Sequence, residues 1–153
     1  MASSRLRRQQ FYTEGCRTVV RPDHPRLDRL TTPDGFVAEE HILVSRSGIG
    51  HGAHALIESA LAAHLAQDRF RLRLPSFLAA AAVVQRGDQL VTMPANLADF
   101  AARAFALSVF VPPIAMPEIS IAQFWHERVQ HDDGHRWFRA LLHTMFKHKQ
   151  RWG

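Results

Sequence analysis

The chain has ten histidines, and the imidazole nitrogen is a common metal ligand. His131 and His135 are four residues apart, as two zinc ligands on one helical turn would be. The intervening residues 132–134 (Asp-Asp-Gly) are typical of a turn and a helix start, however, and the sequence places no third ligand beside them. His51 and His54 are likewise separated by a glycine where a loop is expected to become a helix. We interpret both pairs as helix starts and expect no bound metal.

Nucleophilic and acid–base chemistry finds little support in the residue pattern. Ser45–Gly48 (Ser-Arg-Ser-Gly) is not the Gly-x-Ser-x-Gly turn of hydrolases, and Cys16 has no His and Asp pattern beside it. The carboxylate pairs at 39–40 and 132–133 are adjacent in sequence, which does not fix them around a shared substrate. The lysines lie only at the end of the chain, so there is no phosphate loop of the Gly-x-x-x-x-Gly-Lys type. The sequence predicts no enzyme and no cofactor.

At three places an expected strand ends directly before a helix or a glycine-rich loop, and this arrangement indicates ligand binding. Ser45 precedes a glycine-rich loop, Pro75 and Ser76 precede a helix, and Met93 precedes Pro94, a good first residue of the next helix. The N–H groups at helix starts attract carboxylates, and in open α/β sheets ligands bind beyond the carboxyl ends of the strands. The sequence therefore predicts a pocket for a small anion at these strand ends.

The elements that would position these residues follow from the spacing of apolar side chains. That spacing switches repeatedly between two and about 3.6 residues, which is typical of an α/β domain. The expected strands cover residues 16–21, 41–46, 69–74, 89–93, 107–111 and 119–125. The expected helices cover residues 53–66, 77–85, 94–105 and 134–147.

Three of these elements carry more specific expectations. The stretch RFRLRL alternates strictly, which predicts a half-buried strand with Phe70, Leu72 and Leu74 inward. Its arginines could line a phosphate track, but a solvated outer strand face explains them without a ligand. Ser76 is expected to cap the helix after it. The last helix carries a broad apolar stripe that we expect to be core: Trp137, Phe138, Leu141, Leu142, Met145 and Phe146.

Composition sets wider limits. A chain of 153 residues with 46% hydrophobic and 22% charged residues suits one soluble globular domain. The net charge of +5 and the sequence pI of about 10.6 would suit an anionic partner, but the arginines are spread along the chain and mixed with acidic residues. No apolar run approaches the length of a membrane span, and no secretion signal is recognised at the start. A single cysteine also fits a cytoplasmic location.

Three stretches resemble the effector-binding domain of LysR-type transcription regulators, particularly the group of nodulation and naphthalene-degradation activators. They are RLRRQQFYTEGCRTVVRPDHPRL (Arg5–Leu27), LRLPSFLAAAAVVQRGDQLVTMPANLADFAA (Leu72–Ala102) and FWHERVQHDDGHRWFRALL (Phe124–Leu142). The resemblance implies an α/β fold like that of type 2 periplasmic binding proteins, in which two crossovers join two subdomains and a small effector is held between them. Residues 1–14 would then end a partial first subdomain, 15–111 would form a complete second subdomain, and 112–153 would return to the first.

The resemblance also implies site residues. The family's effector contacts from the second subdomain fall near the strand ends described above. The residues that match them are Ser45, Pro75, Ser76, Phe77, Met93 and Pro94. Trp125, His126, Arg136 and Trp137 are prominent in the family pattern, and we interpret them as packing and capping residues of the returning strand and helix.

The function so implied is that of a non-enzymatic sensor: the C-terminal part of an effector-binding domain, without the helix-turn-helix of the family. The effector is expected to be a carboxylate or an aromatic acid that closes the two subdomains. Closure would shift the balance between conformations of the domain, and this shift would be passed to DNA-binding partners. This fragment itself is expected to contact neither DNA nor a membrane. Two alternatives remain open: a stand-alone small-molecule-binding protein of the same fold, and a truncated regulator with no independent activity.

The missing front of the first subdomain leads to an expectation about association. The strand at 119–125 should lack partners, and the stripe of the last helix should lack its cover. We therefore expect a homo-oligomer or association through the exposed edges of the first subdomain.

Overall fold

The chain forms two compact units in a computed structural model that describes residues 5–45 and 52–148. Unit 1 comprises Met1–Glu14 and Ser120–Gly153, and unit 2 comprises Gly15–Ile119. Unit 2 thus includes residues 112–119. None of the helices within the described ranges is long and apolar enough to cross a membrane.

Unit 2 is built on a five-stranded mixed sheet with the strand order β4-β3-β5-β2-β6. Strand β3 (His41–Val44) runs parallel to β4 (Phe70–Leu74) on one side and to β5 (Leu90–Pro94) on the other. Strand β2 (Cys16–Val20) is antiparallel both to β5 and to β6 (Ser108–Phe110). The carboxyl ends of β3, β4 and β5 therefore point toward the same edge of the sheet.

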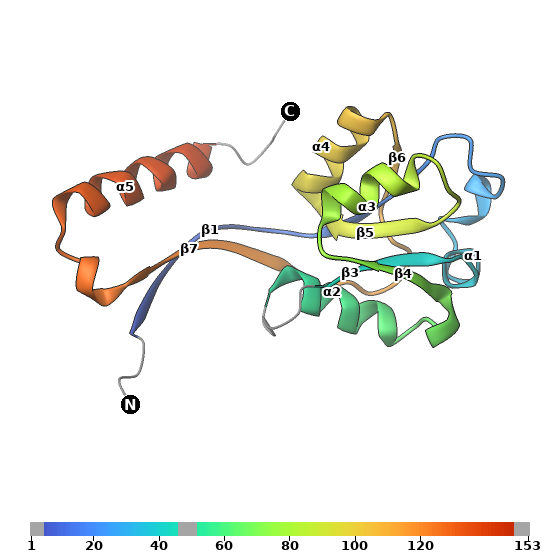
Figure 1. The fold of residues 1–153 in the computed structure, drawn as a ribbon, viewed down its shortest axis with the longest axis horizontal. Coiled ribbons are helices and arrows are strands. Elements are labelled where there is room, and N and C mark those ends of the chain that lie inside the picture. The colour runs from blue at the N-terminus through green and yellow to red at the C-terminus, as the bar shows by residue number, and fades with distance from the viewer. Residues whose placement is uncertain (1–4, 46–51, 149–153) are drawn as a thin grey trace. The chain divides into compact units, whose positions relative to one another are not determined.

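Helices connect the parallel strands, as parallel pairing requires. Helix α2 (Ala53–Ala62) follows β3 and leads to β4, while α3 (Phe77–Val84) leads from β4 to β5. Figure 1 shows α2 on one side of this sheet and α3 and α4 (Ala95–Phe105) on the other. A short helix α1 (Pro33–Ala38) precedes β3, and Thr32 caps it by accepting from the backbone N–H of Gly35. The sequence predicted each of these elements except α1.

The core of unit 2 lies between the sheet and its helices. Every residue of β3 and β5 is buried, as expected for strands that are covered on both faces. Apart from His41 and Thr92, these residues are apolar. Strand β4 pairs with β3 alone and is an edge strand. Phe70 and Leu74 are partly buried, but Leu72 is 38% exposed, so the predicted inward position of Leu72 is wrong.

The arginines of β4 lie on a solvated face and pair with carboxylates of the same chain. Arg71 approaches Glu40 at 3.1 Å, and Arg73 donates to Glu58 at 2.7 Å. Both pairs are exposed and contribute little to stability. These contacts agree with a solvated outer strand face and not with a phosphate track.

Of the two helix starts predicted at Ser76 and Pro94, one agrees with the structure and the other is displaced by one residue. Ser76 caps α3, since its Oγ accepts from the backbone N–H of Ala79 at 3.4 Å, which confirms the expectation. Pro94 was expected to be the first helical residue but is the last residue of β5 and the N-cap of α4. Its φ of −55° suits a helix, but its ψ of 142° is extended, so the helix begins one residue later.

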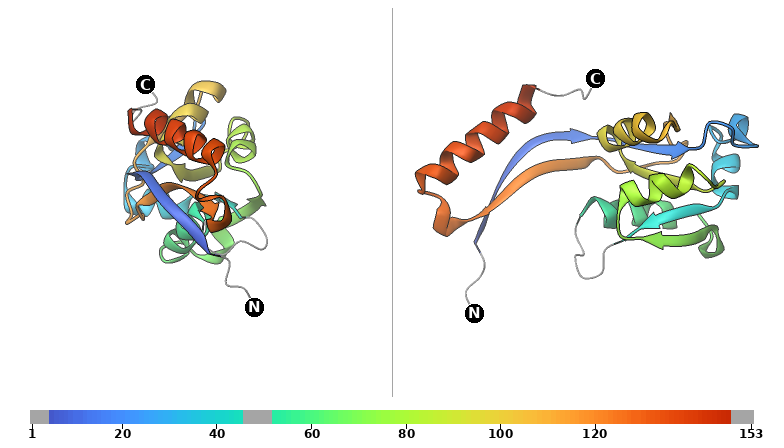
Figure 2. Two further views of the ribbon diagram at one scale, coloured as in Figure 1. Left: turned by 90° about the vertical axis from the view of Figure 1, so that its left-hand side faces the viewer. Right: turned by 45° about the horizontal axis from the view of Figure 1, so that its top comes forward.

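Unit 1 contains a two-stranded sheet of β1 (Leu6–Glu14) and β7 (Ile119–His126), which run side by side in Figure 2, and helix α5 (Asp133–His148). The expectation that the strand at 119–125 lacks partners is wrong, because β1 pairs with it. The sequence did not predict β1, since LRRQQFYTE has polar residues where an alternating strand would have apolar ones.

The apolar stripe of α5 is only partly covered. Phe146 stacks on Phe11 of β1 with ring centroids 4.9 Å apart. Four other members of the stripe are exposed: Trp137 (67%), Phe138 (50%), Leu141 (39%) and Met145 (50%). The prediction that the whole stripe is core is therefore wrong. The expectation that the stripe lacks a cover is wrong for Phe146, which packs on Phe11.

Candidate functional site

The register of the sheet brings the predicted site residues to one edge. Val44 is opposite Leu74, and the backbone N–H of Ser45 donates to the carbonyl of Leu74 at 3.0 Å. Ser45 thus lies beside the end of β4, where Pro75 and Ser76 follow. On the other side of β3, β5 runs parallel from Leu90 and ends at Pro94. Residues that are far apart in sequence therefore form a single edge, which we call the carboxyl edge: Ser45, Pro75, Ser76, Met93 and Pro94.

Two of the helices that begin at this edge have no side-chain cap. Helices α2 and α4 start after Gly52 and Pro94, and neither N-cap residue makes a side-chain hydrogen bond to its helix. In α4 the N–H of Ala95 donates to the carbonyl of Gly15 at 2.9 Å. Helix α3 is capped by Ser76. The positive ends of three helix dipoles thus meet at the carboxyl edge, which favours a bound anion.

The predicted site residues differ in how much they can reach a ligand. Pro75 and Ser76 are exposed and Ser45 is partly buried, so these side chains are accessible from the edge. Phe77 is 8% exposed, Met93 is fully buried, and Pro94 is buried. The side chains of Phe77 and Met93 thus belong to the core behind the edge. The glycine loop expected after Ser45 lies outside the described residues.

A contact that the sequence did not predict joins the first turns of two helices at this edge. The imidazole of His54 in α2 stacks on the ring of Phe77 in α3, with centroids 4.7 Å apart and an interplanar angle of 11°. The sequence pattern suggests a metal ligand as the only role for His54, and its position in the first turn of α2 gives no sign of an aromatic partner. The stack fixes the spacing of the two helix starts.

The opposite edge of the same sheet carries a polar hollow of about 400 Å³. Its lining is Arg26, Ala38, Glu39, Glu40, Arg69, Asp88 and Gln89. Arg26 binds Glu39 through Nε at 2.5 Å and through a second guanidinium nitrogen at 2.8 Å. This hydrogen-bonded ion pair holds the pKa of Glu39 below its ordinary value. Because the Arg26 and Glu39 charges pair within the chain, we interpret this hollow as structural.

His41 lies at the start of β3, behind that hollow. Its side chain is fully buried, and Nε2 is 2.9 Å from the carbonyl oxygen of Phe36, to which it donates. Among the described residues its Nδ1 has no hydrogen-bond partner. Burial lowers the pKa of His41 to about 4, so the imidazole is neutral near pH 7. A neutral, enclosed histidine of this kind serves packing and not ligand binding.

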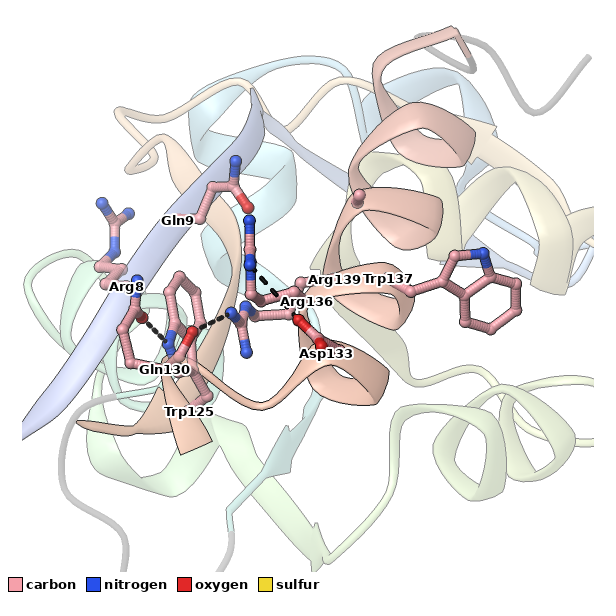
Figure 3. Close-up of a pocket in the computed structure, with 9 residues that line it drawn as sticks. Arg8, Gln9, Trp125, Gln130, Asp133, Arg136, Trp137 and Arg139 are labelled. Atoms are coloured by element: carbon pink, nitrogen blue, oxygen red, sulfur yellow. Dashed lines mark hydrogen bonds and ion pairs between the residues drawn. The ribbon is translucent and has the colours of Figure 1, made fainter. Parts of the chain in front are cut away.

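Unit 1 has a separate open hollow of about 760 Å³ between α5 and the two-stranded sheet. Figure 3 shows Trp125 beside Gln130, with Trp137 pointing away from them. The indole N–H of Trp125 donates to Gln130 at 2.6 Å, and the guanidinium of Arg139 lies 4.6 Å from the Trp125 ring centre. Trp125 is therefore a packing residue, as expected. The same expectation is wrong for Trp137, which is exposed.

The histidines near this hollow serve as helix-start residues. Asp132 accepts from the backbone N–H of His135 at 2.8 Å, which confirms helix initiation by Asp132. His126 accepts from the N–H of Arg128 at 3.1 Å and caps the short 3-10 helix Glu127–Val129, as expected of a capping residue. Across residues 5–45 and 52–148, no group of three or more His, Cys, Asp or Glu side chains is arranged to hold a metal ion.

Known proteins match this chain over nearly its whole length. Residues 2–147 match the LysR substrate binding domain. The chain is 37% identical over 140 residues to the HTH-type transcriptional regulator LinR of Sphingobium indicum, covering 92% of this chain and 46% of LinR. It is 33% identical over 128 residues to the HTH-type transcriptional activator NahR of Pseudomonas putida, covering 84% of this chain and 42% of NahR. The chain thus spans less than half the length of these relatives.

Solved structures of similar fold include transcriptional regulators. The probable transcriptional regulator PA0477 of Pseudomonas aeruginosa superposes with a TM-score of 0.74 at 26% identity, over 90% of this chain and 44% of that one. The regulatory domain of MexT, a transcriptional activator in the same organism, gives a TM-score of 0.65 at 22% identity, over 92% of this chain and 66% of that one. The fold is the periplasmic-binding-protein-like α/β fold of LysR regulatory domains. From the match over residues 2–147, this chain belongs to the LysR substrate-binding domain family.

Proposed function

We propose that this chain is the effector-sensing part of a LysR-type transcription regulator and that the effector binds at the carboxyl edge of unit 2. The observation that carries this proposal is the meeting of three parallel strand ends with three helix starts at one edge. Ligands of open α/β sheets bind at such edges. In this proposal unit 2 is the second subdomain of the effector-binding domain, and unit 1 belongs to the first.

The chemistry of the edge favours a small carboxylate with an apolar or aromatic body. Helix starts favour the carboxylate. The hydroxyl groups of Ser45 and Ser76 can donate to its oxygens, and Pro75 offers a rigid apolar surface. Phe77 and Met93 back the edge from the core, while Pro94 fixes the turn into α4. In this proposal Ser45, Pro75 and Ser76 contact the effector, and Phe77, Met93 and Pro94 support the site from the core.

The effector would act by a shift of population. A ligand that binds one arrangement of the domain better than another changes the balance between them by its difference in binding free energy. We propose that this change in conformation is transmitted to the DNA-binding part of a longer regulator. The residues of this chain would then contact the effector and not DNA or a membrane. A regulator of this kind acts in the cytoplasm, as a homo-oligomer.

A ligand screen tests the proposal. Benzoate and its ring-substituted derivatives would be added to the chain, with benzamide as the neutral control of nearly the same shape. A carboxylate that binds the native state should raise the free energy of unfolding by about 2.7 kcal/mol at a hundredfold excess over its Kd. Ser76→Asp should keep the helix cap but remove this stabilisation, because it places a negative charge at the edge. Equal stabilisation of the wild type and Ser76→Asp would exclude the carboxyl edge as the site.

A further inference from the structure

Strand β2 begins at the carboxyl edge, because it runs antiparallel to β5. Cys16 is opposite Pro94, and Arg17 is opposite Met93. Side chains of directly opposite residues in an antiparallel pair lie on the same face of the sheet, so the stem of Arg17 lies beside Met93. Arg17 is partly buried, whereas Met93 is fully buried. The start of β2 therefore brings a cationic side chain to an edge whose five named residues are all uncharged.

The guanidinium group of Arg17 turns back toward the beginning of β2. Its Nη1 donates to the carbonyl of Cys16 at 2.9 Å. A Cβ atom placed on Gly15 would lie 3.8 Å from the same Nη1, so the guanidinium lies beside this exposed glycine. The carbonyl of Gly15 in turn accepts from the backbone N–H of Ala95, in the first turn of α4. The cation thus lies next to the segment that holds the start of α4.

Arg17 has no carboxylate partner in the described part of the chain, unlike several other arginines of unit 2. Arg21, just beyond the other end of β2, pairs with Asp88 at 2.7 Å, and Arg73 on β4 pairs with Glu58 at 2.7 Å. The contact of Arg17 is with a neutral carbonyl and occupies one of its five N–H donors. Its positive charge and its remaining donors are therefore available to an anion at the carboxyl edge.

We propose that Arg17 is the specificity-determining residue of the effector site and that its guanidinium pairs with the effector carboxylate. This inference rests on the proposed effector site at the carboxyl edge and names the group that recognises the charge. The hydroxyl groups of Ser45 and Ser76 can donate to the oxygen of a neutral amide as well as to a carboxylate, so they distinguish the two only weakly. A guanidinium has the opposite charge to a carboxylate and can donate two parallel hydrogen bonds to it. Arg17 would therefore give the site its preference for an acid over a neutral analogue.

The test compares benzoate with benzamide, which differ in charge but hardly in shape, by calorimetric titration of the wild type and its variants. Arg17→Gln should weaken benzoate binding roughly 10- to 100-fold, as expected for the loss of a hydrogen bond to a charged group, and should leave benzamide binding unchanged. Arg17→Lys keeps the charge without the paired donors and should lose less than Arg17→Gln. In the wild type, the NMR signal of the Arg17 Nε–H group should shift with benzoate and not with benzamide.

Arg73→Gln is the matched control. It removes the same charge from the same sheet, one residue before the end of β4, but from an arginine whose charge is already paired with Glu58. This variant should keep the wild-type preference for benzoate over benzamide. Circular dichroism and the urea midpoint show whether each variant is folded. An equal loss of benzoate affinity in Arg73→Gln would assign the effect to net charge and contradict direct pairing with Arg17.

Wild-type benzoate affinity in Arg17→Gln, or equal losses in Arg17→Gln and Arg17→Lys, would overturn the role of Arg17. A parallel loss of benzamide binding would also overturn it, since Arg17 would then support only the fold of the site. If the amide signals of Ser45 and Ser76 still respond to benzoate in Arg17→Gln with unchanged affinity, the proposed effector site holds without Arg17. If benzoate changes no signal at the carboxyl edge of the wild type, the effector site and the role of Arg17 are both overturned.

Discussion

His54 and Phe77 stack nearly in parallel, 4.7 Å apart, and so connect the first turn of α2 to the first turn of α3. Both turns begin at the carboxyl edge, where β3 and β4 end side by side. The contact keeps two helix starts at a fixed separation. An anion that binds both starts needs this separation to be set before it arrives, because ordering the site on binding would cost affinity.

Replacement of His54 tests this role. His54→Ala should lower the free energy of unfolding by about 1 kcal/mol, in the range of aromatic pairs, and should weaken binding of an aromatic carboxylate several-fold. His54→Phe restores a stacking ring without the imidazole and should recover most of both losses. Urea denaturation and calorimetric titration measure the two effects. Unchanged affinity in His54→Ala would mean that the stack supports only the fold.

Ser76 is expected to matter for stability as a helix cap. Ser76→Ala removes the oxygen that accepts from the N–H of Ala79 and should cost about 1 kcal/mol of unfolding free energy. Ser76→Asp supplies another acceptor at a helix start, where a negative charge is favourable, and should unfold at the same urea concentration as the wild type. If Ser76→Ala also leaves the urea midpoint unchanged, the cap contributes no stability.

The burial of His41 predicts a pH dependence of stability. Its pKa is lowered from 6.5 to about 4. Between these two values, His41 is protonated in the unfolded chain and neutral in the folded chain. The stabilising contribution is fully present above pH 6.5 and is lost as the pH falls toward 4, with a slope of up to about 1.4 kcal/mol per pH unit.

Urea denaturation across that pH range, with His41→Gln as the comparison, measures the slope. The amide of Gln can keep a donor to the Phe36 carbonyl without a titrating group. The lowered pKa of Glu39 adds a loss only below its ordinary value of 4.5. An equal slope in the variant above that pH would assign the effect to another group.

The two units should differ in local stability. Strand β5 is buried throughout and lies inside a five-stranded sheet, whereas β1 is largely exposed and belongs to a two-stranded one. Amide hydrogen exchange at β5 should be about 100-fold slower than at β1, because β1 opens without global unfolding. Similar exchange rates in the two strands would show that the chain unfolds as one cooperative unit.

The parts of the fold that the sequence predicted are those with a local cause. Ser76 caps α3 through an acceptor three residues before its donor, and buried strands such as β5 are mostly apolar. Strand β1 has no such signal, since it exists by pairing with β7 at the far end of the chain. Likewise the periodicity of α5 indicates an apolar face but not what covers it.

In the candidate site, too, features with a local sequence signal were predictable, whereas features that depend on packing were not. Strand ends and helix starts are readable in sequence, so Ser45, Ser76 and Pro94 could be named in advance. Which of them present a side chain depends on packing: Met93 is enclosed and Ser76 is open. The contact of His54 with Phe77 joins two helices across the edge and has no signature in either helix alone.

The most direct test of the effector site is a titration of the isotope-labelled chain with benzoate and its ring-substituted derivatives, followed by amide NMR. If the effector binds at the carboxyl edge, the largest changes in chemical shift should lie at Ser45, at Ser76 to Ala79 and at the start of α4. Saturable changes confined instead to the Arg8 and Arg139 hollow of unit 1, or to His131 and His135, would contradict it.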